Sequence, residues 1–96
     1  MPESNSDIST LRLAIDEIDE KILDLINRRL LLAQQIGTVK AHGDIRIADP
    51  RREKDIIDHL LRTNSGPLDA KSLQRIFTAI IAAGRSVQEK IKDQND

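Results

Sequence analysis

Residues 11–39 read LRLAIDEIDEKILDLINRRLLLAQQIGTV, and this stretch decides the fold class. Its apolar side chains recur at alternating steps of four and three residues, the spacing of one face of an α-helix. The series comprises Leu11, Ile15, Ile18, Ile22, Leu25, Leu32, Ile36 and Val39, with position 29 missing. Ser6 or Asp7 can cap the first turn, and Gly43 suits the left-handed position after the last. We therefore expect a helix over about residues 7–42, roughly 50 Å long.

Two shorter helices are expected after it. Asp49-Pro50 places an N-capping carboxylate before a proline at the first helical position, which predicts a helix over residues 50–64. A third helix, over residues 70–92, follows Asp69, with Leu68 and Leu73 placed as a hydrophobic staple. No strand-like alternation or internal repeat is visible. The sequence predicts a single all-α domain over residues 1–96 with three helices, one of them very long.

The composition argues against several classes of partner and cofactor. Phe77 is the only aromatic residue and the formal net charge is −1, so neither base stacking nor a basic surface supports nucleic-acid binding. No apolar run approaches the roughly 18 residues of a membrane span, and no signal peptide is visible, so we expect a cytoplasmic location without a membrane partner. There is no cysteine, and the two histidines lack metal-ligand spacing, so we expect no metal and no cofactor.

The length of the first helix predicts a second copy of the chain. A compact domain of this size has a radius of gyration near 12–13 Å, so a helix of about 50 Å overhangs it. The uncovered part would be an exposed apolar strip, which usually marks a partner surface. A symmetric homodimer with the long helices packed together is the simplest solution, although a heterodimer or an extended coiled coil fits the same pattern.

Three basic residues of the long helix are candidates for binding an anion. Arg29 stands where the stripe calls for an apolar residue, between Leu25 and Leu32, and Lys40 lies on nearly the same face, roughly 16 Å further along. A packed stem with a solvated guanidinium explains Arg29 equally well, and a position at the helix C-terminus explains Lys40. Arg12 is some 25 Å from Arg29, so it could serve only the site of an antiparallel partner, or be an ordinary solvated arginine.

The other two helices add polar residues beside the apolar faces. Asp49, Arg52 and Glu53 share a face of the second helix, although capping alone explains Asp49 and a first-turn position explains Glu53. Gly84 and Gln88 are one turn apart in the third helix. A glycine within a helix costs about 1 kcal/mol relative to alanine, which indicates close packing or room for a ligand. Gln88 is either a partly buried amide or a rim residue. Together these groups suit a small dianion.

Several motifs resemble those of the all-α chorismate mutases. They are LR at 11–12, IDEID at 15–19, LDLINRR at 23–29, IGTVK at 36–40, DPRRE at 49–53, GPLD at 66–69, IF at 76–77 and II at 80–81. The resemblance covers roughly residues 8–90. It extends to the free-standing enzymes and to the N-terminal mutase domain of bifunctional prephenate dehydratase proteins. The initial Met1 and the polar tail lead us to expect a free-standing protein.

This resemblance implies an intertwined homodimer whose active sites draw on both protomers. It implies that Arg12 of the partner subunit and Arg29 bind the two carboxylates of chorismate. Lys40 and Gln88 would hydrogen-bond the ether oxygen, where negative charge builds as the C–O bond breaks.

The second and third helices would complete the site implied by the family. Glu53 would bind the ring hydroxyl, with Asp49 and Arg52 along the same wall. Gly84 stands where many members have a serine that binds a carboxylate, which predicts weaker substrate binding rather than lost activity.

The function implied is the [3,3] rearrangement of chorismate to prephenate in phenylalanine and tyrosine biosynthesis. This reaction needs a positioned substrate and preorganised cations rather than a nucleophile or a general base. Two alternatives stay open at this point. An isochorismate pyruvate lyase shares the fold and much of the cationic site, and a non-catalytic helical dimerisation module would need no convergence of these residues.

Overall fold

The computed structural model describes residues 3–94, and this part of the chain forms three helices and no strand. They are α1 (Glu3–His42), α2 (Pro50–Thr63) and α3 (Ala70–Gln94). The all-α prediction with one very long helix is therefore confirmed. α2 ends one residue earlier than expected and α3 continues two residues further.

The two ends of α1 differ from the sequence prediction. The helix begins at Glu3 and is 40 residues long, so neither Ser6 nor Asp7 is its N-cap. At the other end, the described glycines all have negative φ, and Asp44 takes the left-handed conformation with φ of 53°. The prediction that Gly43 holds this position was wrong by one residue. Asp is among the non-glycine residues that tolerate this region, and the Ile45 amide then donates to the Lys40 carbonyl at 2.8 Å.

Aspartates cap the two shorter helices, and the cap by Asp49 was predicted from the sequence. Asp49 Oδ1 accepts a hydrogen bond from the Arg52 amide at 3.0 Å, with Pro50 in the first turn. Asp69 Oδ1 accepts from the Ser72 amide at 2.8 Å, and Asp69 Oδ2 accepts from Ser72 Oγ at 3.0 Å. These bonds to the charged carboxylate lower the pKa of Asp69. Each cap fixes the point at which its helix begins.

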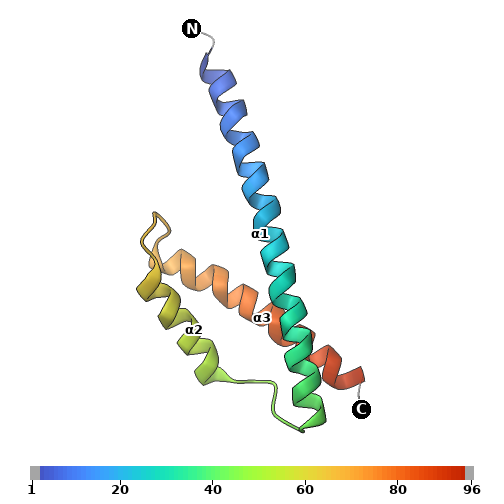
Figure 1. Cartoon of the computed structure of the whole chain (residues 1–96). Coiled ribbons are helices and arrows are strands. Elements are labelled where there is room, and N and C mark those ends of the chain that lie inside the picture. The colour runs from blue at the N-terminus through green and yellow to red at the C-terminus, as the bar shows by residue number, and fades with distance from the viewer. Residues whose placement is uncertain (1–2, 95–96) are drawn as a thin grey trace.

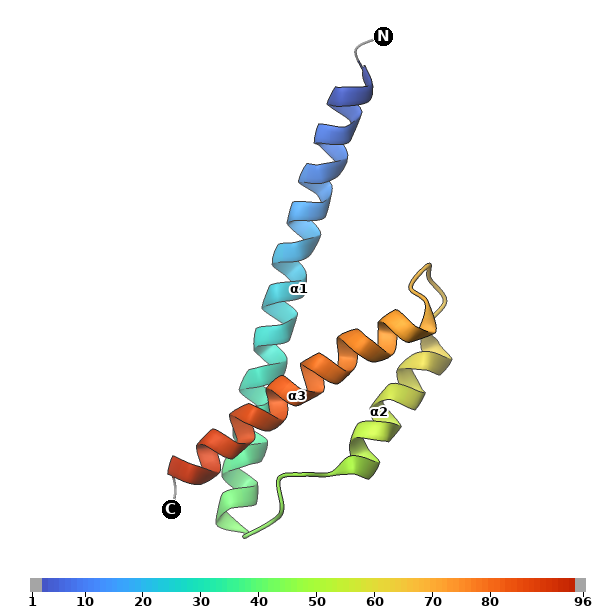
Figure 2. The same cartoon turned by 180° about the vertical axis from the view of Figure 1, so that it is seen from behind.

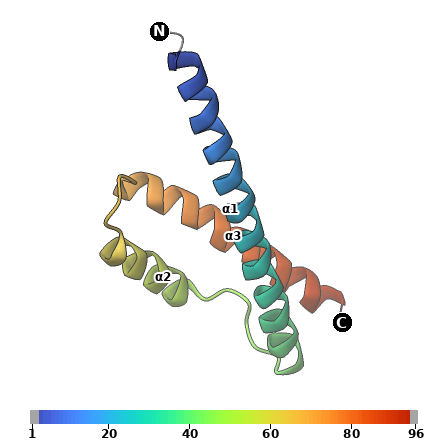
Figure 3. The ribbon, with the colours of Figure 1, turned by 45° about the horizontal axis from the view of Figure 1, so that its top comes forward.

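The three helices form an open arrangement (Figures 1 and 2). α3 crosses the C-terminal half of α1, and α2 packs beside α3. No close backbone contact joins α2 to α1 within the described chain. The N-terminal half of α1 projects beyond both other helices, which the tilted view in Figure 3 shows again. Among the described residues, α1 and α2 therefore each pack against α3.

The core of the single chain is small and the stripe of α1 is uncovered. Only Ala33, Leu73 and Ile81 are buried apolar residues among those described. The exposed large apolar residues of α1 are Ile8, Leu11, Leu13, Ile15, Ile18, Ile22, Leu23, Leu25, Leu31, Leu32, Ile36 and Val39. The radius of gyration is 18.0 Å, well above the 12–13 Å or so of a compact chain of this length. Although many apolar side chains of α1 are exposed, no helix within residues 3–94 is long and apolar enough to cross a membrane.

The crossing of α1 and α3 depends on a glycine. A Cβ atom on Gly37 would lie 3.0 Å from Gln88 Cα and 3.3 Å from Ile91 Cβ, closer than side chains normally pack. The missing side chain therefore lets the two backbones approach at this point. The close approach also places Gln88 directly against α1.

Candidate functional site

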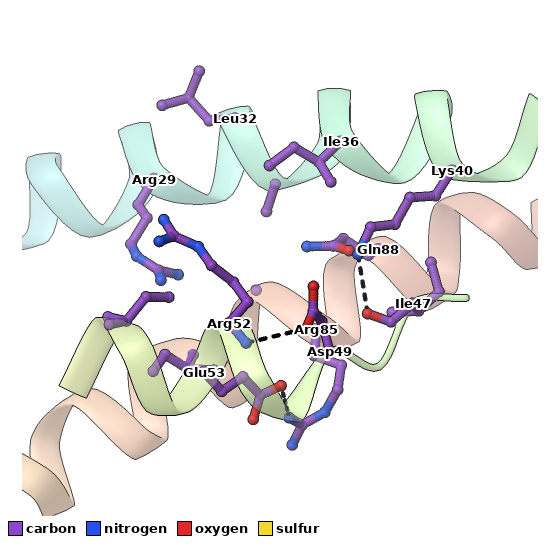
Figure 4. A pocket seen from close by; sticks show the side chains of 14 residues that line it. Arg29, Leu32, Ile36, Lys40, Ile47, Asp49, Arg52, Glu53, Arg85 and Gln88 are labelled. Atoms are coloured by element: carbon purple, nitrogen blue, oxygen red, sulfur yellow. Dashed lines mark hydrogen bonds and ion pairs between the residues drawn. The ribbon is translucent and has the colours of Figure 1, made fainter. Parts of the chain in front are cut away.

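A cavity of about 280 Å³ lies between the three helices (Figure 4). Its lining combines apolar, cationic and acidic side chains. The lining residues are Arg29, Leu32, Ala33, Ile36, Lys40, Ile47, Asp49, Arg52, Glu53, Ile56, Ile81, Gly84, Arg85 and Gln88. α2 packs on α3 and makes no close backbone contact with α1 among the described residues, which leaves room for the cavity between them. Its volume suits a small molecule rather than a polymer.

α1 contributes two cations to one wall of the cavity. Arg29 and Lys40 are both half-buried, and both line the cavity as their shared helical face predicts. Lys40 Nζ donates a hydrogen bond to the Ile47 carbonyl at 3.1 Å, which ties the segment between α1 and α2 to α1. An ammonium group has three N–H donors, so this bond leaves two for a ligand.

α2 contributes Asp49, Arg52 and Glu53 to the opposite wall. The carboxylate of Asp49 caps the helix, so the capping explanation holds while the residue also lines the cavity. The Arg52 side chain extends from α2 towards α1, into the space that Arg29 also enters (Figure 4). Two guanidinium groups from different helices therefore face the same cavity.

An ion pair between α2 and α3 closes the edge of the cavity away from α1 (Figure 4). Arg85 Nη1 donates to Glu53 Oε2 at 2.5 Å, and both side chains are about two-thirds buried, with exposures of 37% and 32%. The hydrogen bond and the charge of Glu53 raise the pKa of the Arg85 guanidinium. Glu53 is thus held by a specific cation instead of being a solvated first-turn acid.

α3 contributes Gly84 and Gln88 to the lining of the cavity. Gly84 is buried, and a Cβ atom there would lie 3.2 Å from Arg29 Nη1. Gln88 Oε1 is buried and has no hydrogen-bond partner among the described residues. Leaving a buried polar atom unpaired costs about 1–3 kcal/mol, so a ligand group that donates a hydrogen bond to this oxygen would be stabilising. Gly84 therefore leaves room for the Arg29 guanidinium, and Gln88 Oε1 remains without a protein donor among the described residues.

The charges that line the cavity favour an anion. Four cationic side chains and two carboxylates leave a formal excess of two positive charges. Within residues 3–94, no three His, Cys, Asp or Glu side chains come together as a possible metal site. The arrangement can bind a small dianion and can stabilise negative charge that develops near Lys40 and Gln88.

The family model of the type II chorismate mutases matches residues 11–89, which is most of the chain. The chain belongs to this family. The match includes every element that lines the cavity, from α1 through α3.

Curated chorismate mutases of two kinds are similar to the chain. It is 39% identical over 90 residues to the bifunctional chorismate mutase/prephenate dehydratase of Aquifex aeolicus, an alignment that covers 90% of this chain and 25% of that protein. It is 33% identical over 88 residues to the chorismate mutase of Methanocaldococcus jannaschii, covering 91% of this chain and 89% of that one. The chain thus spans about a quarter of the bifunctional relatives and nearly all of the shorter enzyme.

Solved chorismate mutases share the fold. The form II structure from Thermus thermophilus superposes with a TM-score of 0.84 at 29% identity, covering 86% of this chain and 94% of that chain. The Helicobacter pylori enzyme in complex with prephenate gives a TM-score of 0.82 at 29% identity, covering 90% and 93%. These likenesses agree with the all-α architecture expected from the sequence.

In this chorismate mutase family member, seven of the eight residues selected from the sequence line one cavity. They are Arg29, Lys40, Asp49, Arg52, Glu53, Gly84 and Gln88. Arg12 does not join them, because it lies in α1 17 residues before Arg29, more than four helical turns away. Its expected role needs a second chain.

The sequence reasoning missed two contributors, Arg85 and the Ile47 carbonyl. Arg85 follows Gly84 and precedes Gln88 by three residues, and this i, i+3 relationship to Gln88 is the signal that could have found it. No sequence pattern marks a backbone carbonyl in an irregular segment. Arg28, the neighbour of Arg29 in the sequence, is exposed and pairs with Asp24 at 3.0 Å.

Proposed function

We propose that this chain catalyses the rearrangement of chorismate to prephenate. The observation that carries the proposal is the convergence of Arg29, Lys40, Glu53 and Gln88 on one cavity with an excess of two positive charges. Chorismate carries two carboxylates, so its charge complements this excess. The family match and the likeness to an enzyme solved with prephenate support the same reaction. The proposal concerns the mutase reaction alone, because the chain spans only a quarter of the bifunctional relatives.

The substrate would lie across the cavity with its ether oxygen near Lys40 and Gln88. Lys40 has two N–H groups left after its bond to Ile47, and the Gln88 amide is adjacent on α3. Arg29 would bind one carboxylate from α1. Glu53 would accept a hydrogen bond from the ring hydroxyl through Oε1, since its Oε2 is bonded to Arg85.

The chemistry requires no group transfer to the protein. One C–O bond of the ether breaks while one C–C bond forms in the same cyclic step, and no proton moves. Holding the compact conformer brings the reacting carbons together, which removes much of the entropic barrier. Negative charge builds on the ether oxygen in the transition state, and Lys40 with Gln88 would stabilise it more than the ground state.

A homodimer is the second part of the proposal. The apolar stripe of α1 is exposed in the single chain, and the three buried apolar residues found in the described part of the chain make a poor core. A second copy packed along α1 would cover this stripe with an identical one. In an antiparallel arrangement, Arg12 of the partner subunit would reach the cavity and bind the second carboxylate.

The test is an assay of purified protein with chorismate, following its ultraviolet absorbance and identifying the product. We expect prephenate, and we expect Lys40→Ala to lower kcat by at least about a hundredfold, the range seen when one preorganised donor is removed. Lys54→Ala is the matched control, because Lys54 is exposed and pairs only with Asp58 in the next turn. Wild-type turnover by Lys40→Ala would refute the role of Lys40.

Two other results would replace the proposal. Pyruvate release from isochorismate, without turnover of chorismate, would identify the lyase of the same fold. A folded dimer that turns over neither compound would identify a non-catalytic dimerisation module.

A further inference from the structure

The ion pair of Arg85 with Glu53 joins residues that are 32 positions apart in the sequence. It is the only described ion pair that links two helices, since the other two join residues one turn apart within a helix. Both partners line the cavity. Arg85 contacts Glu53 by Nη1, and Glu53 is the carboxylate to which we assign the ring hydroxyl.

We propose that Arg85 is a positioning residue that holds Glu53 against the α3 side of the cavity and keeps it from pairing with the substrate-binding cations. This inference rests on the proposed mutase function. It adds a residue whose role is exerted through Glu53 rather than on the substrate.

The distribution of ion pairs supports this role. Glu53 shares its cavity with Arg29, Lys40 and Arg52, any of which a free carboxylate could attract. Among the described side chains, neither Arg29 nor Lys40 takes part in an ion pair. Arg85 therefore satisfies Glu53 at the edge of the cavity, and the cations on α1 stay available for an anion.

The bond also selects which oxygen of Glu53 meets the substrate. Oε2 accepts from Arg85, and no described residue donates to Oε1. A carboxylate held through one oxygen loses rotational freedom, so the other oxygen is preorganised as an acceptor. A purely structural explanation would have the pair fasten α2 to α3, but a partly exposed ion pair contributes little to stability.

The experiment is a double-mutant cycle in the chorismate assay. Arg85→Met keeps the apolar stem and removes the charge, and Arg85→Lys keeps a cation that can reach the carboxylate. We expect Arg85→Met to lower kcat/KM about tenfold and Arg85→Lys to remain within about threefold of wild type. Arg85→Met should change kcat and KM in the same directions as Glu53→Ala changes them. In the Glu53→Ala background, Arg85→Met should cause no further loss.

Arg28→Met is the matched control, because Arg28 pairs with Asp24 on α1 outside the cavity. It should leave kcat/KM unchanged. Circular dichroism and sedimentation check that each variant keeps its helices and its assembly state. If Arg85→Met does not fold, Arg85→Gln replaces it in the cycle, since glutamine keeps a neutral donor.

The possible outcomes separate the claims. Full activity of Arg85→Met would show that the charge has no role and would overturn the inference. An equal loss in the wild-type and Glu53→Ala backgrounds would mean that Arg85 acts independently of Glu53, which also overturns it. A wild-type protein without turnover would overturn the proposed function itself, a result that the wild-type assay gives before any variant is compared.

Discussion

A Cβ atom on Gly84 would lie 3.2 Å from Nη1 of Arg29, so the guanidinium rests against the bare backbone of α3. The added Cβ atom would also lie 3.8 Å from Ala33 Cβ, an ordinary van der Waals contact. The space that a side chain would take at position 84 is thus partly occupied by Arg29. The absence of a side chain at position 84 is thus matched to the position of the Arg29 guanidinium.

Restoring a side chain at position 84 should therefore weaken substrate binding instead of improving it. Gly84→Ser and Gly84→Ala should each lower kcat/KM about tenfold, equivalent to about 1.4 kcal/mol, mainly through KM, because Arg29 must move. The flexible end of Arg29 can shift, so the melting temperature should change little. Steady-state kinetics and thermal denaturation measure the two effects.

Gly66→Ala is the control for this substitution, since the nearest atom to its added Cβ would be Asn64 Oδ1 at 4.0 Å. It should have wild-type kinetics. A Gly84→Ser variant that bound chorismate more tightly than wild type would show that the hydroxyl acts as an added donor and that Arg29 is not displaced.

Gly37→Ala should destabilise the fold. Its Cβ would meet Gln88 Cα at 3.0 Å, and a backbone atom cannot move aside as a flexible side chain can. Overpacking costs about 1–3 kcal/mol, and the better helix propensity of alanine returns at most about 1 kcal/mol. We expect a melting temperature roughly 5 °C lower, measured by circular dichroism. An unchanged melting temperature would mean that α1 and α3 can separate at this crossing without cost.

Mixed dimers test whether Arg12 acts on the partner's site. Arg12→Ala should raise KM, and Lys40→Ala should lower kcat, so each homodimer is impaired. A hybrid dimer has one site with both residues intact if Arg12 crosses to the partner. Random reassembly of equal amounts should then recover about a quarter of the wild-type activity, because half of the dimers are hybrid and each has one complete site. A mixture no more active than the average of its parents would show that Arg12 does not act on the partner's site.

The cap of α3 predicts a dependence of stability on pH. The hydrogen bonds from Ser72 lower the pKa of Asp69 from its ordinary value of 3.8, so the folded state binds this proton less readily than the unfolded state. The stabilisation is therefore complete above that value and is lost as the pH falls through the lowered pKa. Wild type should melt at a higher temperature than Asp69→Asn at pH 7, and the difference should shrink below about pH 4. A difference that stayed constant down to pH 3 would contradict this linkage.

The helices and their caps follow from local interactions, which is why the sequence predicts them. The apolar period of α1 and the Asp49-Pro50 signal depend on residues within a turn or two of each other. The first turn of α1 begins earlier than predicted, at Glu3, because several polar residues near the N-terminus can begin a helix equally well. The left-handed residue after α1 was also misplaced, since Gly43 and Asp44 both tolerate that conformation.

The sequence predicted those residues of the candidate site that lie close together on one helix. Arg29 and Lys40 share a face of α1, and Gly84 and Gln88 are one turn apart in α3. The role of Arg85 could not be predicted from the sequence, because its partner Glu53 is 32 residues away and lies on another helix. An ion pair between helices depends on how the helices cross, which no local pattern encodes.

The sequence by itself determined that the chain is helical, where its helices lie to within a few residues, and which polar groups break its apolar faces. These properties come from backbone propensities, capping and periodicity, all of which act over short distances along the chain. Only the tertiary structure decided that α2 packs on α3 with no close backbone contact to α1 among the described residues, that a cavity lies between these helices, and that Gly84 faces the Arg29 guanidinium. Those features arise from steric fit and charge pairing between segments far apart in the sequence, and such interactions exist only once the helices have packed.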